Sequence, residues 1–196
     1  MKYLELTRGY RAKVDDEDYR RLVRWKWRAN LSGGGWVYAV RSVKGPDGRV
    51  KNRMLHYEVL GLESPLSGGR VVDHVNHESL DCRKANLRVC TVQQNRWNTR
   101  AVRKKSSSRY KGVTWQPAKR PFRGGWQVTI TCGGERRYVG FFGREYEAVV
   151  AYNRAAARLF GKYGYVNRWE GPTREADRQA EGYRPRREEK ARWVWP

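Results

Sequence analysis

The residues best suited to chemistry form one short series. Asp73 and His74 are adjacent, and Asn86 and Asn95 follow them. A carboxylate and an amide oxygen are hard ligands that suit Mg²⁺ with several water molecules retained. An imidazole at the same point could deprotonate a water molecule held near a phosphate. Aspartate and asparagine also serve as turn and cap residues, so only the complete set favours a hydrolytic metal site.

The elements that must position this series lie between residues 70 and 98. Residues 71–73 and 87–90 read as short strands joined by a long polar loop, and Thr91 can cap a following helix. The predicted order is strand, loop, strand, helix. In that order Asp73 can face a residue of the helix across the loop.

Residues 1–62 read as short strands and turns with little helix. Strands are expected at 3–6, 10–14, 26–30, 36–42 and 49–53, with turns at the glycines between them. Asp15 is a good N-cap for a short helix, and a second apolar helical turn ends at Gly61. This region either contacts DNA or supports the residues that follow. The DNA-contacting alternative rests on arginines spaced along one element, namely Arg20, Arg21, Arg24 and Arg28.

Residues 101–108 are basic and serine-rich, which is typical of a linker between domains. Strands at 110–116, 126–132 and 136–142 then form an expected three-stranded antiparallel meander. A helix over 144–160 carries an apolar, alanine-rich face that can cover one face of that sheet. We therefore predict an α+β protein with a region at 1–62, a core at 63–100, a linker, a second domain at 109–168 and a charged tail at 169–196.

The charge of the chain indicates a polyanionic partner. The 196 residues carry 42 Lys+Arg against 20 Asp+Glu, a formal net charge of +22. The 53 residues between Asp81 and Glu135 contain 13 Lys or Arg, no carboxylate and several aromatic residues. That interleaving favours nucleic acid over a membrane surface.

Composition also excludes several classes of protein. No long apolar run is present, and the first residues lack the apolar core of a signal peptide, so we expect a cytoplasmic location in a bacterium or a phage-infected cell, and no secretion. Cys82, Cys90 and Cys132 form no C-x-x-C pair. We therefore expect neither a disulfide framework nor a structural zinc.

The segment DHVNHESLDCRKANLRVCTVQQNRWN resembles the phage and intron-encoded HNH endonucleases. Upstream stretches such as LTRGYRAKVDDEDYRRL, WKW, YAVRS and LHYEVLG follow in that group's order. The resemblance implies a ββα nuclease core that hydrolyses DNA phosphodiester bonds with one Mg²⁺ or Mn²⁺, as a homing endonuclease would.

The resemblance also implies roles for individual residues. Asp73 and Asn95 would bind the metal, His74 would be the general base, and Asn86 would brace the loop. Asn95 stands where other HNH enzymes carry histidine, and Cys82 replaces the group's usual asparagine, a change that we interpret as structural. Three secondary candidates keep open alternatives. His77 could contact a phosphate or lie at the surface, and His56 could support the site from the preceding helix, although packing is the preferred interpretation. Arg83, like Arg88, could hold a loop carboxylate such as Asp81 or contact phosphate.

The second half, RYKGVTWQ to GWQVTI to RYVGFFGREYEAVVAYNRAAARLFGKYGYVN, resembles the Apetala-two/ERF DNA-binding domain. That likeness implies a sheet that enters the major groove. The matching contact positions are Lys111, Thr114, Gln116, Thr129, Thr131, Arg136 and Tyr138. An arginine can make a bidentate contact to guanine, and a glutamine can read adenine.

Two functions therefore compete. The first is a site-specific, metal-dependent HNH endonuclease that binds double-stranded DNA as a monomer, with no membrane partner and no small-molecule substrate. The second is an inactive DNA-binding regulator that uses the HNH core as a scaffold. An inactive relative would be expected to lack Asp73 or His74, and both are present.

Overall fold

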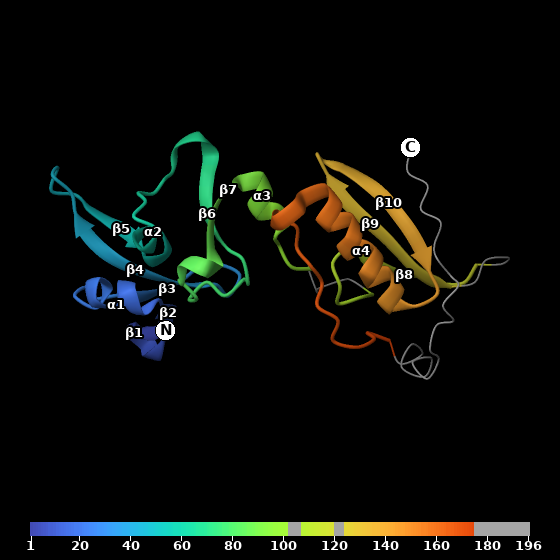
Figure 1. Cartoon of the computed structure of the whole chain (residues 1–196), viewed down its shortest axis with the longest axis horizontal. Helices are drawn as coiled ribbons and strands as arrows, with labels where there is room; N and C mark the ends of the chain where they lie inside the picture. The colour runs from blue at the N-terminus through green and yellow to red at the C-terminus, as the bar shows by residue number, and fades with distance from the viewer. Residues whose placement is uncertain (102–106, 120–123, 175–196) are drawn as a thin grey trace. The chain divides into compact units, whose positions relative to one another are not determined.

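The computed structural model describes residues 1–101, 107–119 and 124–174 (Figure 1). The chain divides into two compact units, Met1–Thr99 and Arg100–Pro196. The expected linker begins just after this division, and its residues 102–106 lie outside the described residues, as does the tail from 175 onward. No helix within the described ranges is long and apolar enough to cross a membrane.

The first unit is a mixed α/β fold built from small antiparallel sheets. Its strands are β1 (Lys2–Glu5) paired with β2 (Arg11–Val14), β3 (Arg28–Leu31), β4 (Val37–Lys44) and β5 (Val50–Met54) in one sheet, and β6 (Arg70–His74) paired with β7 (Leu87–Thr91). Its helices are α1 (Asp16–Leu22), α2 (Leu55–Val59) and α3 (Val92–Trp97). The predicted order of strand, loop, strand and helix is thus present at β6, β7 and α3.

A single apolar core joins these small sheets. Leu4, Leu22 and Leu55 are almost completely buried, and each contributes roughly 1.5–3 kcal/mol by leaving water. Val72 of β6 and Leu87 of β7 belong to the same cluster. The β6–β7 hairpin is therefore packed on the elements of residues 1–62.

Strand β2 also holds the loop between β6 and β7 through its backbone. Lys13 N donates to Leu80 O at 2.8 Å, and Cys82 N donates to Lys13 O at 2.9 Å. Asp15 occupies the predicted N-cap position of α1, but its side chain makes no cap hydrogen bond there. Its carboxylate instead accepts a hydrogen bond from Lys84 N at 2.8 Å, because the loop between β6 and β7 brings this backbone donor within reach.

The four arginines expected along one element lie on three different segments. Arg20 and Arg21 are on α1, Arg24 is in the turn that follows, and Arg28 is on β3. Arg28 donates to Asn52 Oδ1 at 2.6 Å across the sheet. The expectation of a single basic element was wrong, because the chain turns between Arg21 and Arg28.

The second unit contains the predicted meander and its helix. β8 (Val113–Gln116), β9 (Gly125–Cys132) and β10 (Glu135–Phe142) pair in sequence order, and α4 (Glu145–Phe160) packs on one sheet face (Figure 1). The helix buries its small residues there, which allows close approach. Gly112 adopts φ +75°, and a Cβ at that position would lie 2.3 Å from the Tyr152 ring, so only glycine fits.

The segment after α4 returns to the start of β8. The Asn167 side chain accepts from Lys111 N through Oδ1 at 2.8 Å and donates from Nδ2 to Lys111 O at 3.0 Å, so its amide pairs with the Lys111 backbone. Trp169 stacks on Tyr110, with ring centroids 5.2 Å apart. The described part of the expected tail is therefore part of the second unit.

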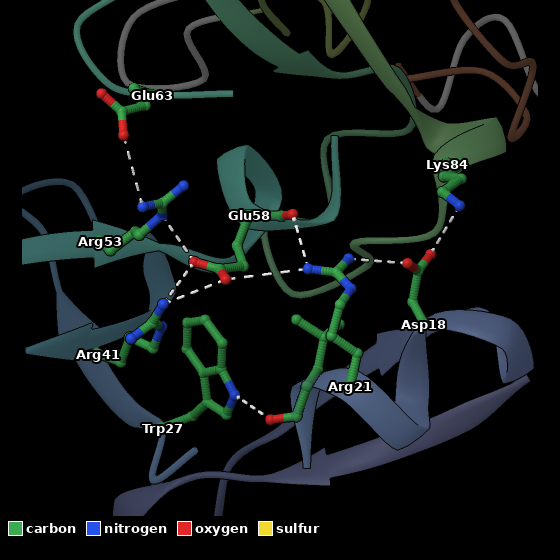
Figure 2. A network of polar contacts seen from close by, with 9 residues as sticks. Asp18, Arg21, Trp27, Arg41, Arg53, Glu58, Glu63 and Lys84 are labelled. Atoms are coloured by element: carbon green, nitrogen blue, oxygen red, sulfur yellow. Dashed lines mark hydrogen bonds and ion pairs between the residues drawn. The ribbon is translucent and has the colours of Figure 1, made fainter. Parts of the chain in front are cut away.

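A network of ion pairs fixes α2 in the first unit (Figure 2). Glu58 accepts from Arg41 Nη2 at 3.1 and 3.0 Å and lies 2.7 Å from Arg53 Nε. Arg21 of α1 donates to Glu58 O at 3.3 Å and to Asp18 Oδ1 at 2.9 Å. Burial raises the pKa of Asp18, but hydrogen bonds from Arg21 and Lys84 outweigh it and the net shift is downward.

Replacement of Glu58 by alanine should destabilise the protein. The Arg41 side chain is only 11 % exposed, so the substitution leaves a buried cation without its carboxylate. We expect the free energy of unfolding to fall by about 2–4 kcal/mol. This is less than the roughly 3–5 kcal/mol expected when one partner of a fully buried ion pair is removed, because Arg53 retains access to water. Urea unfolding followed by circular dichroism measures the change.

Glu63→Ala is the matched control. Glu63 also faces Arg53, at 3.8 Å, but its side chain is 88 % exposed. Its removal should leave stability almost unchanged. Equal effects of the two substitutions would contradict the role given to the buried network.

Candidate active site

The β6–β7 hairpin brings the chemistry-bearing residues to one end. Asp73 and His74 are the last two residues of β6, and their register partners on β7 are Arg88 and Leu87. Both Asp73 and His74 are buried, at 6 % and 8 % exposure. The pair therefore lies buried at the point where β6 enters the connecting loop, and Cys82 of that loop packs against His74.

The Asp73 carboxylate is held from two sides. Arg88 donates to Oδ2 through Nε at 2.9 Å and Nη2 at 2.7 Å. Asn98, at the C-cap of α3, places its Nδ2 3.0 Å from Oδ2 and 3.2 Å from Oδ1. Oδ2 is thus crowded with donors, whereas Oδ1 has one long hydrogen bond and keeps lone-pair capacity.

The His74 imidazole lies in a largely aromatic and apolar environment. Its ring centroid is 4.9 Å from that of His56, edge to face, and 6.4 Å from that of Tyr38 on β4. Cys82 Sγ is 4.0 Å from His74 Nε2. Burial lowers the pKa of His74 to about 4, partly opposed by the negative charges of Asp73 and Asp81. The ring is therefore neutral at pH 7 and able to accept a proton.

His56 is the more deeply buried of the two imidazoles, at 4 % exposure. Burial, with the neighbouring His74, lowers its pKa to about 3. Its Nδ1 is buried and has no hydrogen-bond partner among the described residues. Tyr38 contacts His56 as well, at 5.7 Å between centroids, so the three rings form one cluster.

The connecting loop is braced by Asn86. Its Nδ2 donates to Asp81 O at 2.8 Å, its Oδ1 accepts from Asn76 N at 3.0 Å, and its backbone carbonyl accepts from Val75 N at 2.9 Å. Arg83 pairs with Asp81 through two hydrogen bonds, at 2.7 and 2.6 Å. The alternatives for the two arginines are thereby separated: Arg83 holds Asp81, and Arg88 holds Asp73.

Helix α3 begins with the predicted cap. Thr91 Oγ1 accepts from Gln94 N at 3.1 Å, and the Gln94 side chain accepts from Thr91 N at 2.9 Å, a complete capping box. The Asn95 side chain makes no hydrogen bond within the described part of the chain, whereas Asn98 contacts Asp73. Residues three apart share a helix face, and this spacing is the signal that could have identified Asn98.

His77 and Cys82 occupy structural positions. His77 adopts the left-handed conformation, φ 63°, and its backbone nitrogen donates to His74 O at 3.1 Å within the turn after β6. Cys82 is fully buried, which raises the pKa of its thiol. Cys82 therefore remains an uncharged packing residue against His74.

Asp73 and Asn95 carry oxygens of the kind that a hard divalent ion prefers, but the residue after α3 that contacts Asp73 is Asn98. No group of three His, Cys, Asp or Glu side chains in the described ranges could hold a metal. A cation at Asp73 Oδ1 would therefore take most of its ligands from water and phosphate. Mg²⁺ is commonly bound in that way.

Six of the seven predicted DNA-contact residues share one face of the second unit's sheet. Thr129 pairs with Tyr138 and Thr131 with Arg136 in the register of β9 and β10, and Thr114 pairs with Gln127. Gln116, two residues after Thr114, follows the same alternation. This face is opposite the one that packs on α4, which includes the buried Val113, Val128 and Ile130.

Lys111 lies apart from that face, in the turn before β8. Its ammonium is over the Tyr165 ring, 5.7 Å from the centroid. Burial lowers the pKa of Lys111 to about 8. The structure thus does not bring Lys111 together with the other six predicted contacts.

Comparison with known proteins agrees with this geometry in the first unit. Residues 63–97 match the family model described as HNH endonuclease, and this segment contains β6, β7 and α3. The chain is 25 % identical over 161 residues to an uncharacterised HNH endonuclease of Acanthamoeba polyphaga mimivirus, covering 82 % of this chain and 76 % of that protein.

A second relative is Protein 3.8 of Escherichia phage T7, 29 % identical over 100 residues, covering 50 % of this chain and 77 % of that protein. No solved structure matches the chain significantly. The matches support a nuclease.

Asn86→Ala should loosen the loop that follows His74. The substitution leaves Asn76 N and Asp81 O without their side-chain partners in a largely buried site. We expect a loss of about 1–3 kcal/mol in the free energy of unfolding. Asn76→Ala, which removes a more exposed side chain of the same loop, should cost less, and the reverse order would contradict the bracing role.

Proposed function

We propose, from the HNH endonuclease match of residues 63–97, that this protein is a site-specific, divalent-metal-dependent endonuclease that hydrolyses DNA phosphodiester bonds. The observation that carries the proposal is the juxtaposition of a buried carboxylate and a neutral imidazole, Asp73 and His74, at the start of a braced loop. A homing role fits a nuclease joined to a separate reading unit, because linkage raises the local concentration of each on DNA.

In this proposal His74 is the general base. A pKa of about 4 keeps the imidazole neutral but makes it a weak base in the free protein. A substrate phosphate brings negative charge to the ring, which favours the protonated form and raises its basicity. The imidazole therefore becomes a stronger base when DNA is bound.

Asp73 and Asn95 would hold one Mg²⁺ or Mn²⁺. When bound, such an ion neutralises charge on the phosphate and on the leaving oxygen. Asp73 Oδ1 is the oxygen best able to serve, because Oδ2 is occupied by Arg88 and Asn98.

The neighbouring rings position His74. His56 contacts the imidazole edge to face from α2, and Tyr38 contacts both histidines from β4. Glu58 holds α2 through its arginines, so His56 is presented from a fixed helix. We assign Asn86 to the loop, Arg83 to Asp81, and His77 to the turn.

The second unit would read the DNA major groove through its sheet, as in the Apetala-two/ERF domain. The outer face presents threonines, a glutamine, Arg136 and Tyr138 and carries no carboxylate at the predicted contact positions. Tyr138 is 59 % exposed there. Such a face can offer both phosphate and base contacts.

The competing function is a DNA-binding regulator with an inactive HNH core. The Arg88 pairing of Asp73 is the observation that favours it, because a carboxylate neutralised by arginine needs no metal. We propose for either function a monomer on double-stranded DNA in the cytoplasm.

His74→Ala should reduce plasmid cleavage by about 10²–10⁴-fold, the usual worth of general-base assistance, while DNA binding persists. The measurement compares nicked and linear products of supercoiled DNA with Mg²⁺, with Mn²⁺ and with EDTA. His77→Ala, which removes an imidazole from the turn, should cost less than tenfold. Binding without cleavage by the wild-type protein, on DNA containing its bound site, would favour the regulator.

Arg136→Ala should weaken binding to a selected DNA site by about 1–3 kcal/mol and relax base preference at one position. Arg137→Ala is the matched control, because it removes the same charge from the next residue, whose register partner Ile130 is on the α4 side of the sheet. Fluorescence anisotropy with specific and mixed-sequence duplexes measures the loss of binding for each variant and separates a loss of base preference from a general loss of charge. Equal losses would show that the sheet face does not read sequence.

A further inference from the structure

Arg88 faces Asp73 as a resident counter-ion. The two residues are direct register partners on β6 and β7, and both side chains are largely buried, at 14 % and 7 % exposure. Nε and Nη2 both point to the same oxygen, Oδ2, at 2.9 and 2.7 Å. This arrangement neutralises the carboxylate before any metal is present.

The same arrangement shapes what Asp73 can offer a cation. With Arg88 and Asn98 on Oδ2, only Oδ1 retains lone-pair capacity. A guanidinium beside the carboxylate also repels a second cation through a largely buried site, where screening by water is weak. Both effects lower affinity for a divalent ion in the free protein.

We propose that Arg88 makes metal binding depend on DNA: it holds Asp73 as an ion pair in the free protein, so that Mg²⁺ or Mn²⁺ binds weakly until a DNA phosphate joins the site. This inference rests on the proposed metal-dependent nuclease. The Asp73 carboxylate is neutralised by Arg88, so the phosphate supplies the negative charge that attracts the ion. It also supplies oxygen ligands, which Mg²⁺ prefers. Because coupling between ligands is reciprocal, the ion strengthens DNA binding by the same factor.

The first test measures Mn²⁺ binding to the full chain without DNA, by the loss of the free-ion electron paramagnetic resonance signal. Arg88→Gln removes the charge and keeps a donor, so it should bind Mn²⁺ at least about fivefold more tightly, the lower end of usual coupling factors. Arg83→Gln is the matched control, since Arg83 also pairs with an aspartate of the same hairpin, through Nε to Oδ1 and Nη2 to Oδ2 of Asp81. It should leave Mn²⁺ affinity unchanged.

Equal or weaker Mn²⁺ binding by folded Arg88→Gln would overturn the proposal and leave Arg88 as a structural support for Asp73. A thermal melt establishes folding. Arg88→Lys, which keeps the charge, should retain weak binding, and tight binding by this variant would also overturn it.

The second test does not require an Arg88 variant. The His74→Ala protein, which keeps Asp73 and Asn95, is titrated with Mn²⁺ alone and with a short mixed-sequence duplex, and binding to the duplex alone is subtracted. The proposal requires tighter binding with DNA, and equal affinities or no binding in either case would overturn it. Plasmid cleavage by the wild-type protein reports separately on the nuclease, so a cleaving enzyme with uncoupled Mn²⁺ binding would refute this inference alone.

Discussion

The first unit depends on how it accommodates one buried carboxylate. Asp73 is 6 % exposed, and an unpaired charge in such a place would be strongly unfavourable. Arg88 can reach it only if β6 and β7 keep their register, and Asn98 can reach it only if α3 ends over the hairpin. The Asp73 carboxylate thereby links β6 to Arg88, 15 residues further along the chain on β7, and to Asn98, 25 residues further along at the end of α3.

The hairpin alone is too small to bury this arrangement. Val72 and Leu87 join a core whose larger members include Leu4 of β1, Leu22 of α1, Leu55 of α2 and Trp27, which lies just before β3. Helix α2 has two faces with different tasks, since Glu58 is bound by arginines and His56 contacts His74. The residues before the HNH segment are therefore part of the candidate site's structure, and Tyr38 joins the rings around His74 directly.

Sequence reasoning succeeded where local rules decide the structure. The helix cap at Thr91, the strand pair around the polar loop and the 16-residue helix α4 all follow from short-range patterns. It could not identify Tyr38 as a neighbour of His74, because that contact depends on how β4 packs against the hairpin. The partners of Arg83 and Arg88 were likewise undetermined, because side-chain pairing depends on register. Asp15 shows the same limit, since a suitable cap residue found a better donor in a distant loop.

The site is nearly balanced in charge before substrate arrives. Asp73 is paired with Arg88 and Asp81 with Arg83, while both buried histidines are neutral. A metal ion entering alone would add uncompensated positive charge to this low-dielectric environment, and a phosphate entering alone would add negative charge. Their joint entry preserves the balance better than either alone, and the same phosphate would raise the basicity of His74. Coupled binding of DNA and metal would therefore restrict full activation of the site to the complex with DNA.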